Sequence, residues 1–182
     1  MKKESSAAYI ARLAITLLLI TAVVAAGLAC VNAVTAPEIE ALNAQKTQTA
    51  IEAVLPGGGE EIAFTDDSGI VSTIYKGQSG YAVEVTPAGF NGTVTMMVGV
   101  DNSGSVLGIS IVNHTETAGL GAEAASQGAA GTAFRGQFAG MSGSVSVSKD
   151  GGQVDALTGA TITSRAVCTG VNAALNAVAK LG

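Results

Sequence analysis

The feature that most constrains this chain is a stretch of 24 residues without a charged side chain, Leu13 to Ala36. A helix over that stretch would be about 36 Å long, which is enough to cross a hydrocarbon layer of about 30 Å with some tilt. The 146 residues from Pro37 onward suffice for one domain with a modest core and are too few for two. The sequence therefore predicts a single membrane-spanning helix followed by one domain.

The charges on the two sides of this stretch predict its orientation. Residues 1–12 contain four charged side chains: Lys2, Lys3, Glu4 and Arg12. Their balance is +2, whereas residues 13–182 balance to −7. Positive residues ahead of a membrane helix favour a cytoplasmic N-terminus. We expect residues 1–36 to form a cytoplasmic N-terminus and a transmembrane helix in the plasma or inner membrane, with the domain extracytoplasmic.

Two other uses of an apolar N-terminal stretch are less favoured. A cleaved signal peptide would have a shorter apolar stretch, and cleavage after Val34-Thr35-Ala36 would leave Pro37 at the new terminus. A lipoprotein would need an aliphatic residue three positions before Cys30, where this chain has Gly27. We therefore expect a retained anchor.

Composition excludes several classes of function. The net charge is −5 and the sequence pI is about 4.7, so a basic patch for nucleic acid is not expected. The two cysteines, Cys30 and Cys168, lie in separate parts of the predicted topology and form no CxxC motif. With His114 as the single histidine, zinc and iron–sulfur sites are not expected.

The pattern after the anchor predicts an α+β domain with a mainly antiparallel sheet and flanking helices. We expect a stalk helix and a Gly-rich linker over 37–59, and the domain itself over 60–182. Alternation at period two predicts strands over 70–75, 81–85, 94–100, 107–111 and 144–148, and helical spacing predicts a helix over 163–181. In the strand over 107–111, we expect Leu107, Ile109 and Ile111 to line one face.

The segment from Asp155 to Arg165 is the most informative for chemistry. A Gly-containing turn there precedes a helix start, where unpaired N–H groups and the helix dipole favour an anion. Arg165 adds a positive charge in the first turn. Four hydroxyl groups gather at the same place: Thr158, Thr161, Thr163 and Ser164. A plain helix cap, with Thr163 or Ser164 as the N-cap residue, explains the same pattern, and spacing alone does not decide between the two.

This segment resembles the flavinylation motif of FMN-binding domains. The matching residues are Asp155-x-x-Thr158-Gly159-Ala160-Thr161. The resemblance implies that a transferase couples the phosphate of FMN to the hydroxyl of Thr161. It implies that Gly159 and Ala160 keep the approach of the phosphate open, that Asp155 and Thr158 orient the hydroxyl or assist the transferase, and that Thr163, Ser164 and Arg165 flank the site.

Further segments resemble the same family in the same order along the chain. They are Gly89-Phe90-Asn91-Gly92, Gly99-Val100-Asp101 and His114-x-Glu116-Thr117-Ala118-Gly119-Leu120-Gly121. The resemblance implies that the last segment lies beside the flavin, with ring contacts from His114, Glu116, Thr117 and Leu120. Ala118 departs from the family pattern, which commonly has Pro there.

Taken with the anchor, these segments are most similar to the G-subunit family of Rnf complexes, which are ion-translocating ferredoxin:NAD⁺ oxidoreductases. The resemblance implies covalent FMN, electron relay without catalysis by this chain alone, partner integral membrane and iron–sulfur subunits, and a Mg²⁺-dependent transferase that uses FAD. Three alternatives stay open: the C subunit of Na⁺-translocating NADH:quinone oxidoreductases, a stand-alone exported flavin carrier, and an anchored interaction module without redox function.

Overall fold

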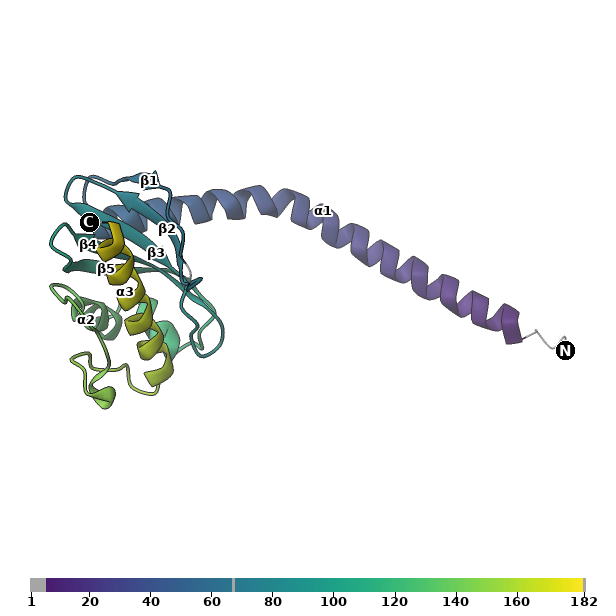
Figure 1. Ribbon diagram of the computed structural model, residues 1–182. Coiled ribbons are helices and arrows are strands. Elements are labelled where there is room, and N and C mark those ends of the chain that lie inside the picture. The colour runs from purple at the N-terminus through teal and green to yellow at the C-terminus, as the bar shows by residue number, and fades with distance from the viewer. Residues whose placement is uncertain (1–5, 67, 182) are drawn as a thin grey trace. The chain divides into compact units, whose positions relative to one another are not determined.

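The structure is a computed structural model that describes residues 6–66 and 68–181. Its elements in chain order are helix α1 (Ser6–Val54), strands β1 (Glu60–Ile62), β2 (Val71–Lys76), β3 (Gly80–Val85), β4 (Val94–Asp101) and β5 (Val106–His114), the 3-10 helix η1 (Gly121–Ala125), helix α2 (Ala129–Gly136), the 3-10 helix η2 (Ser148–Asp150) and helix α3 (Thr161–Leu181). The chain divides into two compact units, residues 1–45 and residues 46–182. The α+β class with an antiparallel sheet is confirmed (Figure 1).

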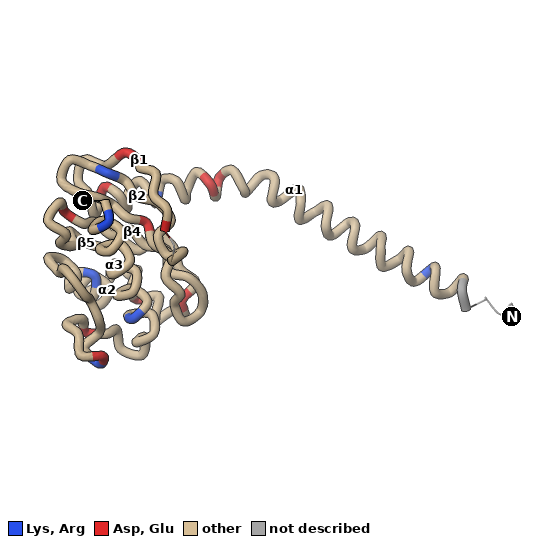
Figure 2. Tube along the Cα trace, viewed as in Figure 1, with Lys and Arg blue, Asp and Glu red and all other residues tan. Residues whose placement is uncertain are grey.

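Helix α1 is 49 residues long and joins the predicted anchor to the predicted stalk without a break. Pro37 lies inside α1, although the sequence placed it at the start of a new helical turn. Figure 2 shows the apolar part of α1 as a long tan stretch, and within the described residues α1 is the one helix long and apolar enough to cross a membrane. In that stretch the hydroxyls of Thr16, Thr21 and Thr35 donate to backbone carbonyls one turn earlier, so these groups are satisfied inside the helix.

The sheet has five antiparallel strands in chain order, β1-β2-β3-β4-β5. Four of these strands confirm predictions, within one to three residues at most ends, and β1 was not predicted. The β4–β5 hairpin turns at Asp101, whose carboxylate accepts hydrogen bonds from the N–H groups of Ser103 and Ser105. The register of the hairpin shifts between Gly99 and Val100, and at this bulge Leu107 is exposed whereas Ile109, predicted on the same face, is buried.

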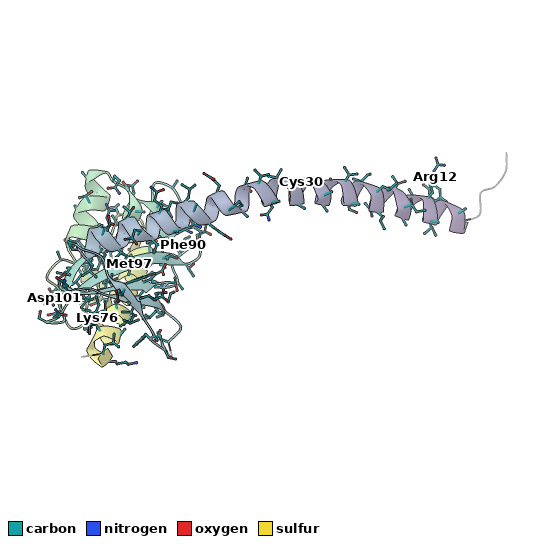
Figure 3. All side chains as sticks on the ribbon, turned by 90° about the horizontal axis from the view of Figure 1, so that it is seen from above. Arg12, Cys30, Lys76, Phe90, Met97 and Asp101 are labelled. Atoms are coloured by element: carbon teal, nitrogen blue, oxygen red, sulfur yellow. The ribbon has the colours of Figure 1, made fainter. Side chains whose placement is uncertain are left out.

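The two faces of the sheet carry different partners. On one face Met96, Val98 and Val100 form a core with α3. On the other face Met97 packs with Ala82, with the last turns of α1 and with the residue that follows the helix; the buried residues there are Ala50, Ile51 and Val54 of α1, and Leu55. Figure 3 labels Met97 next to this end of α1. Because successive strand residues point to opposite faces, the adjacent residues Met96 and Met97 pack into separate hydrophobic clusters.

The connection from β5 to α3 differs most from the prediction. The predicted strand over 144–148 is wrong: Val145 and Val147 are buried, but they lie in an extended segment that adds no strand to the sheet. The side-chain amide of Asn172 bonds both the N–H and the C=O of Val145 at 2.8 Å, so it takes the place of a neighbouring strand. Helix α2 was also missed, and it buries Phe134 edge-on against Phe138.

Candidate functional site

The turn before α3 places Thr161 at the start of that helix. Thr161 is its first residue, two positions earlier than predicted, and the first intrahelical bond runs from the N–H of Ser164 to the carbonyl of Ala160 at 3.0 Å. The preceding N–H groups therefore stand at the positive end of the helix dipole. Gly159 has φ of +75°, a conformation that suits glycine and shapes the turn. The Thr161 side chain is half-buried.

The hydroxyls of Thr163 and Ser164 lie inside the first turn and do not cap the helix, so that interpretation is wrong. Their residues are 1% and 0% exposed. The Ser164 hydroxyl donates to the carbonyl of Ala160 and accepts the N–H of Leu157, both at 3.0 Å. The buried Ser164 hydroxyl therefore stabilises the turn from Leu157 to Ala160. Of the four clustered hydroxyls, those of Thr158 and Thr161 remain on accessible residues.

Glu116 joins the segments that the resemblance singled out. It is only 8% exposed, and its Oε2 accepts a 2.7 Å hydrogen bond from the hydroxyl of Thr163. Its Oε1 accepts the N–H groups of Phe90 at 2.8 Å and Asn91 at 3.2 Å. One carboxylate thus links the loop before β4, the loop after β5 and the first turn of α3.

Glycines make this close approach possible. A Cβ built on Gly89 would lie 2.2 Å from Oε1 of Glu116, and one built on Gly121 would lie 2.4 Å from Oε2. Side chains at either position would displace the carboxylate. A Cβ on Gly159 would meet Leu120 Cδ2 at 2.9 Å, so the loop after β5 also touches the turn before α3.

We call the place where Glu116 joins the two loops to α3 the junction. The remaining predicted residues lie around this junction, and their surroundings differ. His114 ends β5 opposite Val94, and its buried Nδ1 has no hydrogen-bond partner among the residues that the structure describes. Thr117 is exposed, and its carbonyl accepts the N–H of Leu120 at 3.2 Å. Asp155 has an exposed side chain, while its backbone is held on both sides by the amide of Gln137.

Three exposed apolar side chains border the same junction: Phe90, Leu120 and Ile162. Leu120 was predicted from the resemblance, whereas Phe90 and Ile162 were not named as site residues. Phe90 is labelled in Figure 3. The sequence signal that could have found Phe90 and Ile162 is their position inside or beside a matched segment.

The charges near Thr161 are arranged differently from the prediction. Arg165 makes a two-pronged ion pair with Asp150, from Nε and Nη2 at 2.7 Å each. This bonding lowers the pKa of Asp150 and raises that of Arg165. The cation that reaches Thr161 is Lys149, whose Nζ donates to Oγ1 of Thr161 at 3.2 Å. Lys149 and Asp150 were both missed, because neither belongs to a matched motif.

Comparison with known proteins decides the family. Residues 89–176 match the FMN-binding domain family. The G subunit of the ion-translocating oxidoreductase complex of Methanosarcina acetivorans is 32% identical over 182 residues, covering 93% of this chain and 94% of that protein. The chain belongs to the G-subunit family of ion-translocating oxidoreductase complexes.

Two further relatives of this family are named for their coupling ions. The G subunit of the Na⁺-translocating ferredoxin:NAD⁺ oxidoreductase complex of Acetobacterium woodii is 35% identical, covering 88% of this chain and 87% of that protein. The G subunit of the proton-translocating ferredoxin:NAD⁺ oxidoreductase complex of Clostridium ljungdahlii is 40% identical over 102 residues, covering 54% of this chain and 52% of that protein. The coupling ion thus differs between named relatives.

The residues at the junction of this G-subunit family member fit FMN. The helix start and Lys149 suit a phosphate, and Gly159 leaves room for its approach. The exposed apolar side chains of Phe90, Leu120 and Ile162 suit the flat faces of the flavin ring. In the described part of the chain, no group of three or more His, Cys, Asp or Glu side chains is arranged for a metal ion.

Proposed function

We propose that this protein is the membrane-anchored flavin subunit of an ion-translocating ferredoxin:NAD⁺ oxidoreductase, and that FMN is joined to Thr161 through a phosphoester. The observation that carries the proposal is the position of Thr161. Its hydroxyl lies on the first residue of a 21-residue helix, directly after Gly159 and Ala160 and within reach of Lys149. The hydroxyls of Thr163 and Ser164 are engaged inside the protein.

A covalent bond answers a physical problem of this location. The dipole of a helix start adds only about 0.3–2 kcal/mol to anion binding. Occupancy near 99% needs free ligand at roughly 100 times the dissociation constant, which an extracytoplasmic compartment does not sustain for FMN. In the proposed reaction the transferase uses FAD and Mg²⁺, and this chain is its protein substrate.

Bound FMN supplies one- and two-electron redox chemistry. The chain's own residues hold and orient the flavin. We propose that Asp155 and Thr158 guide the transferase, that Gly159 and Ala160 keep the phosphate approach open, and that His114, Thr117 and Leu120 border the ring. Glu116 acts mainly by fixing the two loops to α3, since both of its oxygens accept bonds from the protein.

The proposal also assigns partners and a location. The anchor keeps the domain at a membrane, with the N-terminus cytoplasmic and the flavin domain extracytoplasmic. The relatives are subunits of multi-subunit complexes, and this supports partner integral membrane and iron–sulfur subunits. Co-purification with such subunits separates this function from a stand-alone exported carrier, which would purify alone.

The decisive experiment is the intact mass of full-length protein made together with the transferase. Wild type should gain the mass of FMN less water and stay fluorescent in a denaturing gel. Thr161→Ala should fold, because removing a hydroxyl at a helix start costs at most about 2 kcal/mol, yet should gain no mass. Thr169→Ala is the matched control, because it removes an exposed residue's hydroxyl from the same helix, and it should retain covalent flavin. A Thr161→Ala protein that still carries FMN would show that another hydroxyl is the attachment site.

A further inference from the structure

We propose that Lys149 is the phosphate-binding residue of the flavin site, which positions Thr161 for attachment and then holds the phosphodiester. The inference rests on the proposed attachment at Thr161 and adds a residue that the matched motif does not contain. Its starting observation is the 3.2 Å hydrogen bond from Nζ of Lys149 to Oγ1 of Thr161.

The backbone around Lys149 fixes where its side chain begins. Lys149 is the middle residue of η2, and the N–H of Ser148 bonds the carbonyl of Val154 at 2.7 Å. Gly151 has φ of +83°, and a Cβ on Gly152 would lie 2.0 Å from the carbonyl oxygen of Ser146. Side chains at Gly151 and Gly152 would therefore disturb this turn. The turn places Lys149 and Asp150 beside the first residues of α3.

The neighbouring ion pair leaves Lys149 free for a phosphate. Asp150 engages Arg165 through both carboxylate oxygens at 2.7 Å, so the positive charge of Arg165 is already balanced. Within the described residues Lys149 forms no ion pair, and its ammonium group donates to the hydroxyl of Thr161. A compact ammonium group of this kind is well suited to phosphate oxygens.

The direction of the hydrogen bond suits the attachment step. An ammonium group only donates, so Oγ1 of Thr161 is the acceptor and its own proton points elsewhere. In the step, Oγ1 attacks the phosphorus that bears riboflavin in FAD. The new O–P bond forms, the bridging P–O bond breaks, AMP leaves, and the hydroxyl proton passes to a base of the transferase and then to solvent. One negative charge remains on the phosphodiester beside Lys149.

The test follows the mass of full-length protein over time with the transferase, FAD and Mg²⁺, in a detergent that contains no phosphorus. Lys149→Gln should slow labelling between about 10- and 100-fold, the range of a hydrogen bond to a charged group. Lys149→Arg restores the charge and should recover most of the rate. Lys180→Gln removes the same charge from the last turn of α3 and should label as wild type does.

A second measurement reports the phosphate directly. After labelling has gone to completion, the ³¹P resonance of the phosphodiester should shift in Lys149→Gln and not in Lys180→Gln. Lys149→Met removes the same charge with a side chain of similar length and should shift the resonance as well, which keeps the test available if Lys149→Gln fails to fold.

The outcomes separate the two proposals. Wild-type labelling at Thr161 together with an unchanged rate and unchanged ³¹P resonance in Lys149→Gln would overturn the role of Lys149 alone. A wild-type protein that gains no flavin at Thr161 under these conditions would overturn the proposed function and this inference with it.

Discussion

The hydroxyl of Thr163 donates a 2.7 Å hydrogen bond to Oε2 of Glu116, a residue 47 positions earlier in the chain. The bond is buried, and it connects the first turn of α3 to the loop that follows β5. Since Oε1 of the same carboxylate holds the loop before β4, the position of Thr161 relative to both loops depends on Glu116. One buried carboxylate therefore sets the position of the proposed attachment residue relative to the two loops proposed to surround the flavin.

A double-mutant cycle should show this connection. Thr163→Val keeps the side-chain shape and leaves Oε2 without its donor, so it should lower the free energy of unfolding by about 1–3 kcal/mol. Glu116→Gln should cost a similar amount, and the double variant should cost less than the sum by at least about 0.5 kcal/mol. Additive losses would mean that the two side chains stabilise the domain independently.

Cys168 supplies the measurement for this cycle. It is 4% exposed, and burial raises the pKa of its thiol to about 11, so alkylation near neutral pH should report opening of the domain. Cys30 should be replaced by serine in every variant, because it is the other free cysteine among the described residues.

Glu116→Gln should also change the flavin while leaving it attached. The substitution removes one negative charge beside the proposed ring, so the reduced anionic flavin is less repelled and the reduction potential should rise. Redox titration of the labelled full-length protein measures it, with Glu123→Gln as a control for charge removal in the neighbouring η1. An unchanged potential would place the carboxylate too far from the ring to influence it.

Local patterns predicted much of the fold, and contacts between distant segments account for what they missed. Alternation gave four strands, but it also suggested a strand at Val145 and Val147, where the partner is the side chain of Asn172. A bulge turned Leu107 outward, and alternation cannot reveal a bulge. Pro37 predicted a new helical start, whereas the helix continues through it.

In the site, too, local patterns predicted some features, and contacts between distant segments determined the rest. The motif around Thr161 located the helix start to within two residues, because the glycine turn and the hydroxyls are adjacent in sequence. Lys149 lies 12 residues before Thr161, and its contact depends on how η2 folds back against α3. Likewise, the ion pair with Asp150 redirects Arg165, and sequence alone assigns that arginine to the anion.

The two paired glycines of the β4–β5 hairpin should respond differently to alanine. Gly99 and Gly108 face each other across the strands. A Cβ on Gly99 would lie 2.3 Å from the carbonyl oxygen of Val54 in α1, whereas a Cβ on Gly108 meets nothing within 4 Å. Gly99→Ala should therefore cost about 1–3 kcal/mol, as overpacking does. Gly108→Ala should be neutral or stabilising by up to about 1 kcal/mol. Equal effects in urea unfolding would contradict this packing of α1 on the sheet.

The charge asymmetry around the apolar stretch predicts where the domain resides. A reporter fused to the C-terminus should be active only if it works outside the cytoplasm, because positive residues ahead of the anchor retain the N-terminus inside. The matched control reverses the balance with Lys2→Glu, Lys3→Glu and Arg12→Glu, which should reduce correct insertion. Activity of a strictly cytoplasmic reporter on the unaltered anchor would contradict the proposed location.

Acid should weaken the domain partly through Asp66, which precedes β2. Its Oδ2 accepts the N–H groups of Ile70 at 3.0 Å and Val71 at 2.9 Å, and it also accepts the hydroxyl of Ser68. These bonds, that of Ser68 first, lower the pKa of Asp66 from 3.8 to about 2. A carboxyl group whose pKa is lower in the folded state stabilises the protein above its unfolded pKa, and this stability is lost as pH falls through the folded pKa.

The loss should therefore occur between about pH 4 and pH 2, and it should be missing from Asp66→Asn. That variant should be less stable than wild type at pH 7, and its stability should fall less steeply on acidification, as measured by urea unfolding at a series of pH values. Asp155→Asn removes the same charge from an exposed side chain and should keep the wild-type slope. If Asp66→Asn retained the full acid sensitivity of wild type, another carboxyl group would have to carry it, and the turn before β2 would hold without the charge of Asp66.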